Sequence, residues 1–239
     1  MNAPSRPALR SYDRVAAVYD LLALVWSGGG IASAGAAVAT RVRPGQTVLI
    51  AGVGGGRDAA ALARAGARLT LVDLSPAMLA RAERRVRATV PHAELELVCG
   101  DALSMERPFD IVCAHYFLNV FGPDEVEGVV FRLARCLHPG GLLSIADFSP
   151  RPRGLLAWLH YVIPMKFFAA LGLCVPHPVY SYEELLPDNL VLEATEMVRI
   201  FKFGPTWHQA WFVRDQKAGP ICLDRADRVR DDRHSGGKQ

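Results

Sequence analysis

An alternation of short apolar runs with helix-like segments, across residues 47–147, most constrains what this chain can fold into. The first run, Thr47–Ala51, is apolar and β-branched and lies between turn signals, which is typical of a buried strand. Four more strands are expected, at Arg68–Val72, Glu94–Cys99, Phe109–Ala114 and Leu142–Ala146. Helical crossovers between such strands require a parallel sheet covered on both faces, so the pattern predicts a doubly wound α/β fold.

Helices are expected between the strands. Arg57–Ala65 is helix-like, and Ser75 and Pro76 open the next helix as its N-cap and first residue. Pro123–Leu137 is helix-like too, and the turn residues His138–Gly141 are predicted to close it.

The length of 239 residues fits one domain with additions. We expect an N-terminal helical cap over residues 1–45 and the main domain over 46–215. Within the domain, Leu190–Lys202 and Trp207–Arg214 resemble two strands of an antiparallel edge. The polar, charged segment 216–239 is predicted to be disordered.

Composition excludes several classes of protein. Lys and Arg number 27 against 24 Asp and Glu, and this excess of three charges is too mild to indicate nucleic-acid binding. The five cysteines are odd in number and form no C-x-x-C pair, which predicts reduced thiols in a cytoplasmic protein without a metal site. The first residues contain no apolar core of a secretory signal.

The longest apolar stretch, Leu155–Val175, contains His160, Pro164 and Lys166, which makes it a poor membrane-spanning helix. Contact with a membrane surface through 152–175 stays open.

A glycine-rich loop follows the first strand and leads into a helix. Glycines let a backbone approach a ligand closely, and a helix N-terminus offers N–H groups to an anion. The dinucleotide fingerprint G-x-G-x-x-G/A, counted from Gly52, meets Arg57 at its sixth position, which weakens an NAD interpretation. A tight turn without a ligand is the alternative for the loop alone.

Acidic residues stand at the ends of the next two strands. Asp73 ends the second strand, where a carboxylate can accept hydrogen bonds from a ribose diol. Asp101 follows the third strand. One such residue is commonly a turn residue. The loop and two acids at three successive strand ends together indicate a nucleoside-containing ligand.

These segments resemble the class I S-adenosylmethionine (SAM) methyltransferases over residues 10–150. The resemblance rests on VLIAGVGGG, LVDLSPAML, GDALSM, FDIVCAHYFLNV and LHPGGLLSIADFS. Within that family, YDRVAAVYDLL and DFSPRPR are most similar to ubiquinone/menaquinone-biosynthesis C-methyltransferases and bacterial phospholipid N-methyltransferases.

The resemblance implies a Rossmann-like sheet of seven strands with an antiparallel edge strand, and SAM as cofactor. It implies that Asp73 binds the ribose, that Asp101 and Ala102 lie beside the adenine, and that Tyr12 or Tyr19 touches the cofactor, although both tyrosines also suit a core. The implied cofactor-binding residues are Tyr19, Ala51, Gly52, Gly54, Gly56, Asp73, Leu74, Met78, Asp101, Ala102 and His115.

One position departs from the family pattern. Where the family has an acid that orients the methionyl amine, this chain has Ile50. Asp58, in the first turn of the following helix, is a candidate substitute; the alternative is that it only compensates the helix dipole.

Three residues near the fourth and fifth strand ends are candidates for catalysis. His115 is the best base candidate, because histidine titrates near neutral pH, and Tyr116 follows it. Asp147 ends the fifth strand and can orient substrate or base. A structural histidine and a turn-forming aspartate are the alternatives. Methyl transfer to carbon favours such a base, whereas transfer to an amine needs none.

We therefore expect a cytoplasmic, SAM-dependent methyltransferase acting on a small apolar acceptor: a quinone-type ring, a lipid amine or a secondary metabolite. The resemblance implies that the segment 152–187 covers this acceptor. Two alternatives stay open, a SAM-binding or regulatory protein that has this fold without methyl transfer, and an NAD-dependent oxidoreductase. No nucleic-acid partner is expected, and the sequence leaves the oligomeric state undetermined.

Overall fold

The computed structural model describes residues 30–148, 180–198 and 208–215, with single positions between 159 and 170. The helices are α3 (Gly30–Ala39), α4 (Arg57–Arg64), α5 (Pro76–Thr89) and α6 (Pro123–Arg135). The strands are β1 (Thr47–Ala51), β2 (Arg68–Asp73), β3 (Leu95–Cys99), β4 (Phe109–His115), β5 (Leu137–Phe148), β6 (Leu190–Val198) and β7 (His208–Asp215). Three short 3₁₀ turns are η1 (Ala102–Ser104), η2 (Leu118–Val120) and η3 (Tyr182–Leu185).

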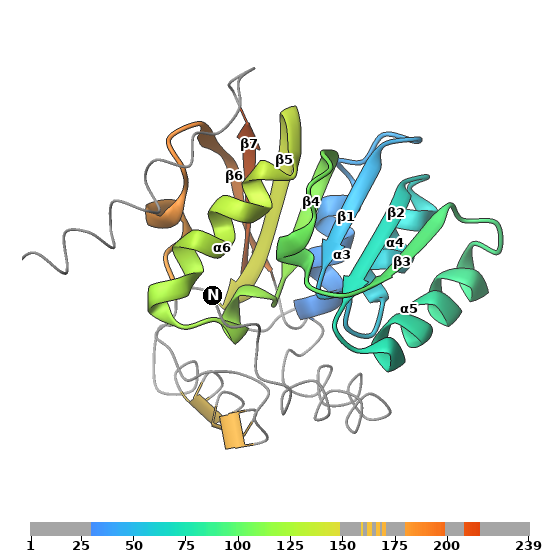
Figure 1. The fold of residues 1–239 in the computed structure, drawn as a ribbon, viewed down its shortest axis with the longest axis horizontal. Coiled ribbons are helices and arrows are strands. Elements are labelled where there is room, and N and C mark those ends of the chain that lie inside the picture. The colour runs from blue at the N-terminus through green and yellow to red at the C-terminus, as the bar shows by residue number, and fades with distance from the viewer. Residues whose placement is uncertain are drawn as a thin grey trace, which may run out of the picture.

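The seven strands form one sheet in the order β3-β2-β1-β4-β5-β7-β6 (Figure 1). Strands β1 to β5 pair in parallel, and β7 pairs antiparallel with both β5 and β6. The predicted α/β class, the seven strands and the antiparallel edge are thus confirmed. The strand order reverses between β1 and β4, which is where ligands bind in sheets of this kind.

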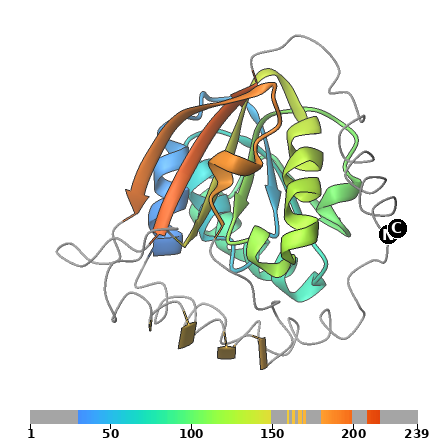
Figure 2. The ribbon, with the colours of Figure 1, turned by 90° about the vertical axis from the view of Figure 1, so that its left-hand side faces the viewer.

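Apolar residues alternate along the strands and form one core on each face of the sheet. Val48 and Ile50 of β1 pack with α3, α4 and α5, whereas Leu49 and Ala51 pack with α6. Figure 2 shows α3 and α6 on opposite sides of the sheet. The two covered faces explain why the central strands are continuous apolar runs.

The start of α5 forms as its sequence predicts. The hydroxyl of Ser75 accepts a hydrogen bond from the backbone N–H of Met78, and Pro76 occupies the first helical position. This cap fixes the chain direction immediately after Asp73, the last residue of β2.

The largest difference from expectation lies at His138–Gly141. These residues were expected to form a turn before the fifth strand, but β5 already begins at Leu137 and they form a bulge within it. Leu137 pairs with Phe109 and Leu142 pairs with Ile111, so four residues stand opposite Asp110 alone. A positive φ of 76° at Gly140 permits this local excursion.

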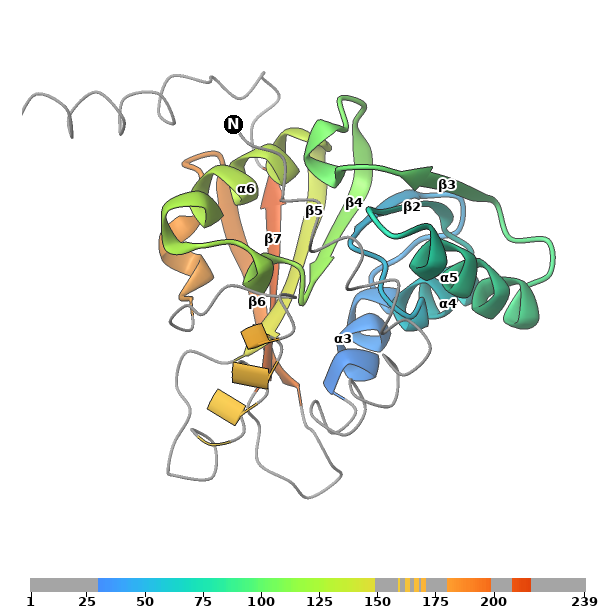
Figure 3. The same cartoon turned by 60° about the horizontal axis from the view of Figure 1, so that its bottom comes forward.

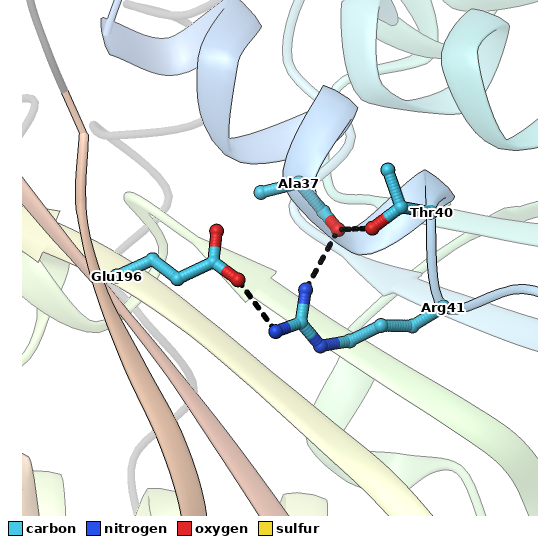
Figure 4. A network of polar contacts seen from close by, with 4 residues as sticks. All are labelled: Ala37, Thr40, Arg41 and Glu196. Carbon is cyan, nitrogen blue, oxygen red and sulfur yellow. Dashed lines mark hydrogen bonds and ion pairs between the residues drawn. The ribbon is translucent and has the colours of Figure 1, made fainter.

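One polar cluster ties the end of α3 to the far strands (Figure 4). A guanidinium nitrogen of Arg41 donates to the carbonyl of Ala37, and another lies 2.5 Å from a carboxylate oxygen of Glu196 on β6. The guanidinium also stacks 3.6 Å from the ring centre of Phe212 on β7. The helix that precedes β1 is therefore fastened to the last two strands.

Several sequence expectations concern residues outside the described ranges: the first 29 residues with Tyr12 and Tyr19, most of 152–179, and the tail 216–239. The described positions between 159 and 170 are helical. Within the described part of the chain, no helix is both long enough and apolar enough to cross a membrane.

Candidate cofactor and acceptor site

The glycine loop after β1 adopts backbone conformations that other residues rarely reach. Gly52, Gly54 and Gly56 have φ angles of 70°, 51° and 76°. A Cβ at Gly56 would lie 2.5 Å from the backbone of Ala82 on α5, so a side chain there would displace that helix. The glycines are thus required both by the turn and by the close packing of α4 and α5.

Backbone N–H groups hold the carboxylate at the end of β2. Asp73 accepts hydrogen bonds from the N–H of Gly54 at 3.3 Å and from the N–H of Ser75 at 2.9 Å. The carboxylate is therefore fixed between the glycine loop and α5. Carboxylate oxygens are acceptors that suit the hydroxyls of a ribose.

The acid after β3 is fixed similarly. Asp101 lies two residues beyond β3, and its carboxylate accepts a hydrogen bond from the N–H of Leu103 at 2.9 Å. Ala102, the first residue of η1, is buried, as is Met78 on α5. The register aligns Asp73 with Cys99, so the structure brings these predicted cofactor residues to one edge of the sheet.

A buried chain of three polar side chains crosses the reversal point of the sheet. Nδ1 of His115, the last residue of β4, lies 2.6 Å from Oδ2 of Asp58 on α4. Nε2 of the same ring lies 2.8 Å from Oγ of Ser144 on β5. All three residues are buried. The predicted base His115 therefore has a hydrogen-bond partner on both ring nitrogens.

The order Asp58, His115, Ser144 is that of a hydrolytic triad, but access excludes that chemistry. Ser144 is 0% exposed in the middle of the sheet, so its hydroxyl meets no substrate. The three residues instead connect α4, β4 and β5, and they fix the orientation of the imidazole ring.

Tyr116 has the one positive φ angle of a non-glycine residue in the described part of the chain, 52°. Its N–H donates to the carbonyl of Ala146 at 2.7 Å, which holds the turn after β4 in this conformation. Strained backbone of this kind concentrates at functional sites. The ring is half-buried at the carboxyl edge of the sheet.

Asp147, near the end of β5, lies on the opposite face of the sheet from His115. Its Oδ2 accepts a hydrogen bond from the hydroxyl of Tyr182 at 2.6 Å, and both residues are buried. The ring of Tyr182 packs edge-on against Trp211 of β7, with ring centres 4.9 Å apart. The structure thus pairs His115 with Asp58, and Asp147 with Tyr182.

Next to this pair, burial raises the pKa of Tyr180 to about 12, and the nearby carboxylate of Asp147 adds to the shift. The Tyr180 hydroxyl donates to the carbonyl of Phe121 at 3.1 Å. Phe121 packs edge-on against Phe117, with ring centres 5.3 Å apart. Aromatic side chains therefore surround the turn that follows β4.

Sequence reasoning did not identify Ser144 or Tyr182. Ser144 interrupts an otherwise apolar buried strand, and its alternation with Leu142 and Ala146 places it on the face of His115. A lone polar residue in such a strand is a signal that it has a buried partner. Tyr182 follows the largely undescribed segment 149–179 and offered no local signal.

The residues present fit SAM as a cofactor. The loop glycines and the N-terminus of α4 provide a backbone surface, and the acids of β2 and β3 stand where a ribose and a base would lie. One carboxylate oxygen, Oδ1 of Asp58, is buried and has no hydrogen-bond partner among the described residues. A Cβ at Gly35 of α3 would lie 2.3 Å from this oxygen, so the backbone of α3 covers it.

Comparison with known proteins places these features in context. A sequence profile described as a methyltransferase domain matches residues 48–141. The chain is 30% identical over 182 residues to the ubiquinone/menaquinone biosynthesis C-methyltransferase of Paracoccus denitrificans, covering 73% of this chain and 72% of that protein. It is 32% identical over 168 residues to the demethylmenaquinone methyltransferase of Tropheryma whipplei, covering 65% and 66%.

A solved structure with a similar fold is the magnesium protoporphyrin IX methyltransferase of Synechocystis, crystallised with S-adenosylhomocysteine (SAH). The TM-score is 0.59 at 19% identity, and the match covers 80% of this chain and 84% of that one. This likeness concerns the fold.

Proposed function

Because the chain belongs to the class I SAM-dependent methyltransferases, we propose that it transfers the methyl group of SAM to a ring carbon of a small, apolar, quinone-type acceptor. The observation that carries the proposal is the carboxylate of Asp73, held by the N–H groups of Gly54 and Ser75 where a ribose would lie. The names of the relatives support the quinone class of acceptor.

The cofactor residues divide by chemistry. Asp73 accepts hydrogen bonds from the ribose hydroxyls, and Asp101 with Ala102 and Met78 lines the adenine. Gly52 and Gly54 let the backbone approach the methionyl part. When bound, SAM supplies an electrophilic methyl carbon on a sulfonium sulfur, which leaves with the bonding electron pair.

The residues on the acceptor side have separate roles. We assign Tyr116, which follows β4, to the acceptor side. The ring of Phe117 lies next to the glycine loop, since a Cβ at Gly52 would be 2.6 Å from it.

We assign to the Asp147 carboxylate, which Tyr182 orients, the proton that a ring hydroxyl of the acceptor loses as the adjacent ring carbon attacks the methyl carbon. The methylated carbon then releases its own hydrogen as a proton to solvent, and the hydroxyl oxygen regains the proton that Asp147 took. His115 holds Asp58 in place, because both of its ring nitrogens are bonded.

The segment 152–187 covers the acceptor in this proposal. Its described helical positions lie beyond the carboxyl ends of β4 and β5 (Figure 3). Ile163 and Phe167, four residues apart, are 53% and 39% exposed, with Lys166 exposed beside them. An apolar stripe with a basic residue suits the surface of an anionic membrane, from which an apolar acceptor would be drawn.

The test of the activity is a two-step assay. Calorimetry first measures binding of SAM, SAH and NAD to the full chain. Incubation with methyl-labelled SAM then compares three samples: a short-chain demethylated naphthoquinol, phosphatidylethanolamine, and buffer without an acceptor. Mass spectrometry identifies the products.

A labelled methyl group on a ring carbon of the naphthoquinol supports the proposal. Labelled lipid amine would overturn the acceptor class, and SAM binding without transfer to either acceptor would favour a protein that has lost methyl transfer. Binding of NAD alone would overturn the function.

Membrane contact has its own test. The chain should co-sediment with vesicles of phosphatidylcholine and phosphatidylglycerol, and Phe167→Asp should weaken this binding while SAH binding is unchanged. Leu97→Asp is the matched control, because Leu97 is 37% exposed on the distant edge strand β3. Equal sedimentation of both variants and the parent would contradict membrane contact through this segment.

A further inference from the structure

The aromatic ring of Phe117 lies against the glycine loop, although it comes from the turn that follows β4. A Cβ at Gly52 would be 2.6 Å from Cδ2 of this ring, and 3.4 and 3.5 Å from the two ring carbons bonded to Cδ2. A point above the face of the ring would be more nearly equidistant from these three atoms, so the ring meets the loop with its edge. The two faces of the ring take no part in this contact.

The turn that carries Phe117 is fixed on both sides of the ring. Before it, Tyr116 has a φ angle of 52° and donates its N–H to the carbonyl of Ala146 at 2.7 Å. After it, Phe121 packs edge-on against Phe117 at an angle of 68°, and the carbonyl of Phe121 accepts the hydroxyl of Tyr180. Phe117 itself is half-buried. The ring is thus held beside the loop while part of its surface is accessible.

The order of the strands places this ring on the reactive side of the cofactor. Along the carboxyl edge, Asp101 after β3 is followed by Asp73 on β2 and then by the glycine loop after β1. The turn with Phe117, after β4, comes next. SAM has its parts in the same order in the proposed pose: the adenine, the ribose, and then the sulfonium, which one methylene group joins to the ribose. In this pose the sulfonium reaches the glycine loop beside β4, where Phe117 lies.

The chemistry of the sulfonium decides which partner suits it. The group carries a permanent positive charge but has no N–H or O–H, so it cannot donate a hydrogen bond of the kind that a carboxylate accepts from the ribose. The face of an aromatic ring is negative and attracts a cation that lies within about 6 Å of the ring centre. SAH is neutral at sulfur, so the same ring offers it no such attraction.

We propose that Phe117 recognises the sulfonium of SAM through a cation–π contact and thereby favours SAM over SAH. This inference rests on the proposed function, because it assigns one side chain to the charged centre of the cofactor. The attraction exists before methyl transfer and disappears with the charge, so the ring helps to hold the donor and to release the product. It stabilises the bound donor more than the transition state, in which the charge on sulfur declines, and it therefore acts on affinity.

The test compares the affinities of SAM and SAH, which differ in the methyl group and the positive charge that it creates. Calorimetry on the full chain gives the ratio of the two dissociation constants, the Kd of SAH over the Kd of SAM. In Phe117→Leu this ratio should fall roughly 3- to 30-fold below that of the parent, which is the range of a cation–π contact. The fall should come from weaker SAM binding, with little change for SAH.

Three further variants make the result specific to the ring. Phe117→Tyr keeps an aromatic face and should keep the ratio of the parent. A fluorinated phenylalanine at position 117 keeps the shape of the ring but weakens its negative face, so it should lower the ratio even if Phe117→Leu fails to fold. Phe109→Leu is the matched control, because Phe109 is buried at the amino end of β4. Its replacement should lower stability and leave the ratio unchanged.

The outcomes separate the two claims. If the parent chain binds neither SAM nor SAH, the proposed function fails. If the parent binds both, and the ratio in Phe117→Leu and in the fluorinated variant stays within about twofold of the parent's, the proposed function stands and the assignment of Phe117 is overturned. A ratio that falls equally in Phe109→Leu, or as far in Phe117→Tyr as in Phe117→Leu, would overturn it too, because the effect would then not depend on an aromatic face beside the loop.

Discussion

The two halves of the carboxyl edge hold their acids in different ways. On the side of β2 and β3, backbone N–H groups hold the carboxylates, and the partners of Asp73 and Asp101 lie two residues ahead in the chain, with Gly54 as a third donor. On the side of β4 and β5, side chains hold the carboxylates: His115 lies 57 residues from Asp58, and Tyr182 lies 35 residues from Asp147.

This difference matches what each half must do. We call the side of β2 and β3 the cofactor half and the side of β4 and β5 the acceptor half. Backbone contacts depend little on side-chain identity, so the cofactor half can keep one geometry through many changes of sequence. Side-chain pairs change with a single substitution, so the acceptor half can be altered without disturbing the cofactor. We infer that specificity for the acceptor lies in β4, β5 and η3.

The largest expected effect concerns the cofactor half. SAH at about a hundred times its Kd should raise the melting temperature of the parent by about 5–10 °C. Asp73→Ala should abolish this shift, because the ribose loses its acceptor. Thermal melts with and without SAH measure it.

Asp110→Asn is the control for this experiment. Asp110 also accepts a backbone N–H, that of Thr47 at 2.8 Å, but at the amino end of the strands. It should keep the SAH shift. Loss of the shift in both variants would mean that the effect of Asp73→Ala is a general loss of stability.

A second prediction concerns the side-chain half. Ser144→Ala leaves Nε2 of His115 buried without a partner and should lower the free energy of unfolding by about 2 kcal/mol. The melting temperature should fall by about 4–8 °C. Ser104→Ala removes an exposed serine that also bonds a backbone carbonyl, that of Asp101, and should change little. Equal losses in both variants would contradict a special role of the buried chain.

A third prediction uses pH. Burial, with the charge of Asp147 second, raises the pKa of Tyr180 to about 12 in the folded state, above its ordinary value of 10.0. The folded state therefore holds this proton more tightly than the unfolded state. Its contribution to stability is complete below about pH 10 and is lost as the pH rises from about 10 to about 12.

Urea unfolding between pH 9 and pH 11 measures this effect. Tyr180→Phe should flatten the alkaline decline of stability, and the parent should show one tyrosine whose absorbance changes near pH 12. The same decline in both proteins would show that Tyr180 ionises at its ordinary pKa.

The smallest effect is expected at the cluster drawn in Figure 4. Glu196→Gln removes an ion pair between partly exposed side chains and should cost no more than about 0.5 kcal/mol, less in high salt. Arg41→Ala should cost more, because it also removes the contacts with Ala37 and Phe212. Melting temperatures in low and high salt distinguish the two, and a larger loss for Glu196→Gln would contradict this order.

Local signals allowed much of the cofactor half to be predicted. Thr47–Ala51 was bounded correctly because a β-branched apolar run between turn residues has few alternatives. Ser75 was identified as a helix cap from its place before Pro76. The conformation of the residues around Gly140 was harder to predict, since a bulge within a strand and a turn before a strand use the same residue types.

The acceptor half could not be predicted in the same way. His115 was chosen by its place at a strand end, but its two partners are 57 and 29 residues away and become visible when strand pairing is known. The pairing of Asp147 with Tyr182 depends likewise on η3 folding back over β5. The assignment of catalytic roles to His115, Tyr116 and Asp147 stays a prediction.

The position of β7 between β5 and β6 has a consequence for synthesis. The ribosome makes β6 first, yet in the described sheet β6 is hydrogen-bonded to β7 and to no earlier strand. Until β7 emerges, β5 presents an open edge, and β6 has nothing to pair with. The nascent chain therefore carries an open edge on β5 and an unpaired β6 at once, a state prone to association with other chains.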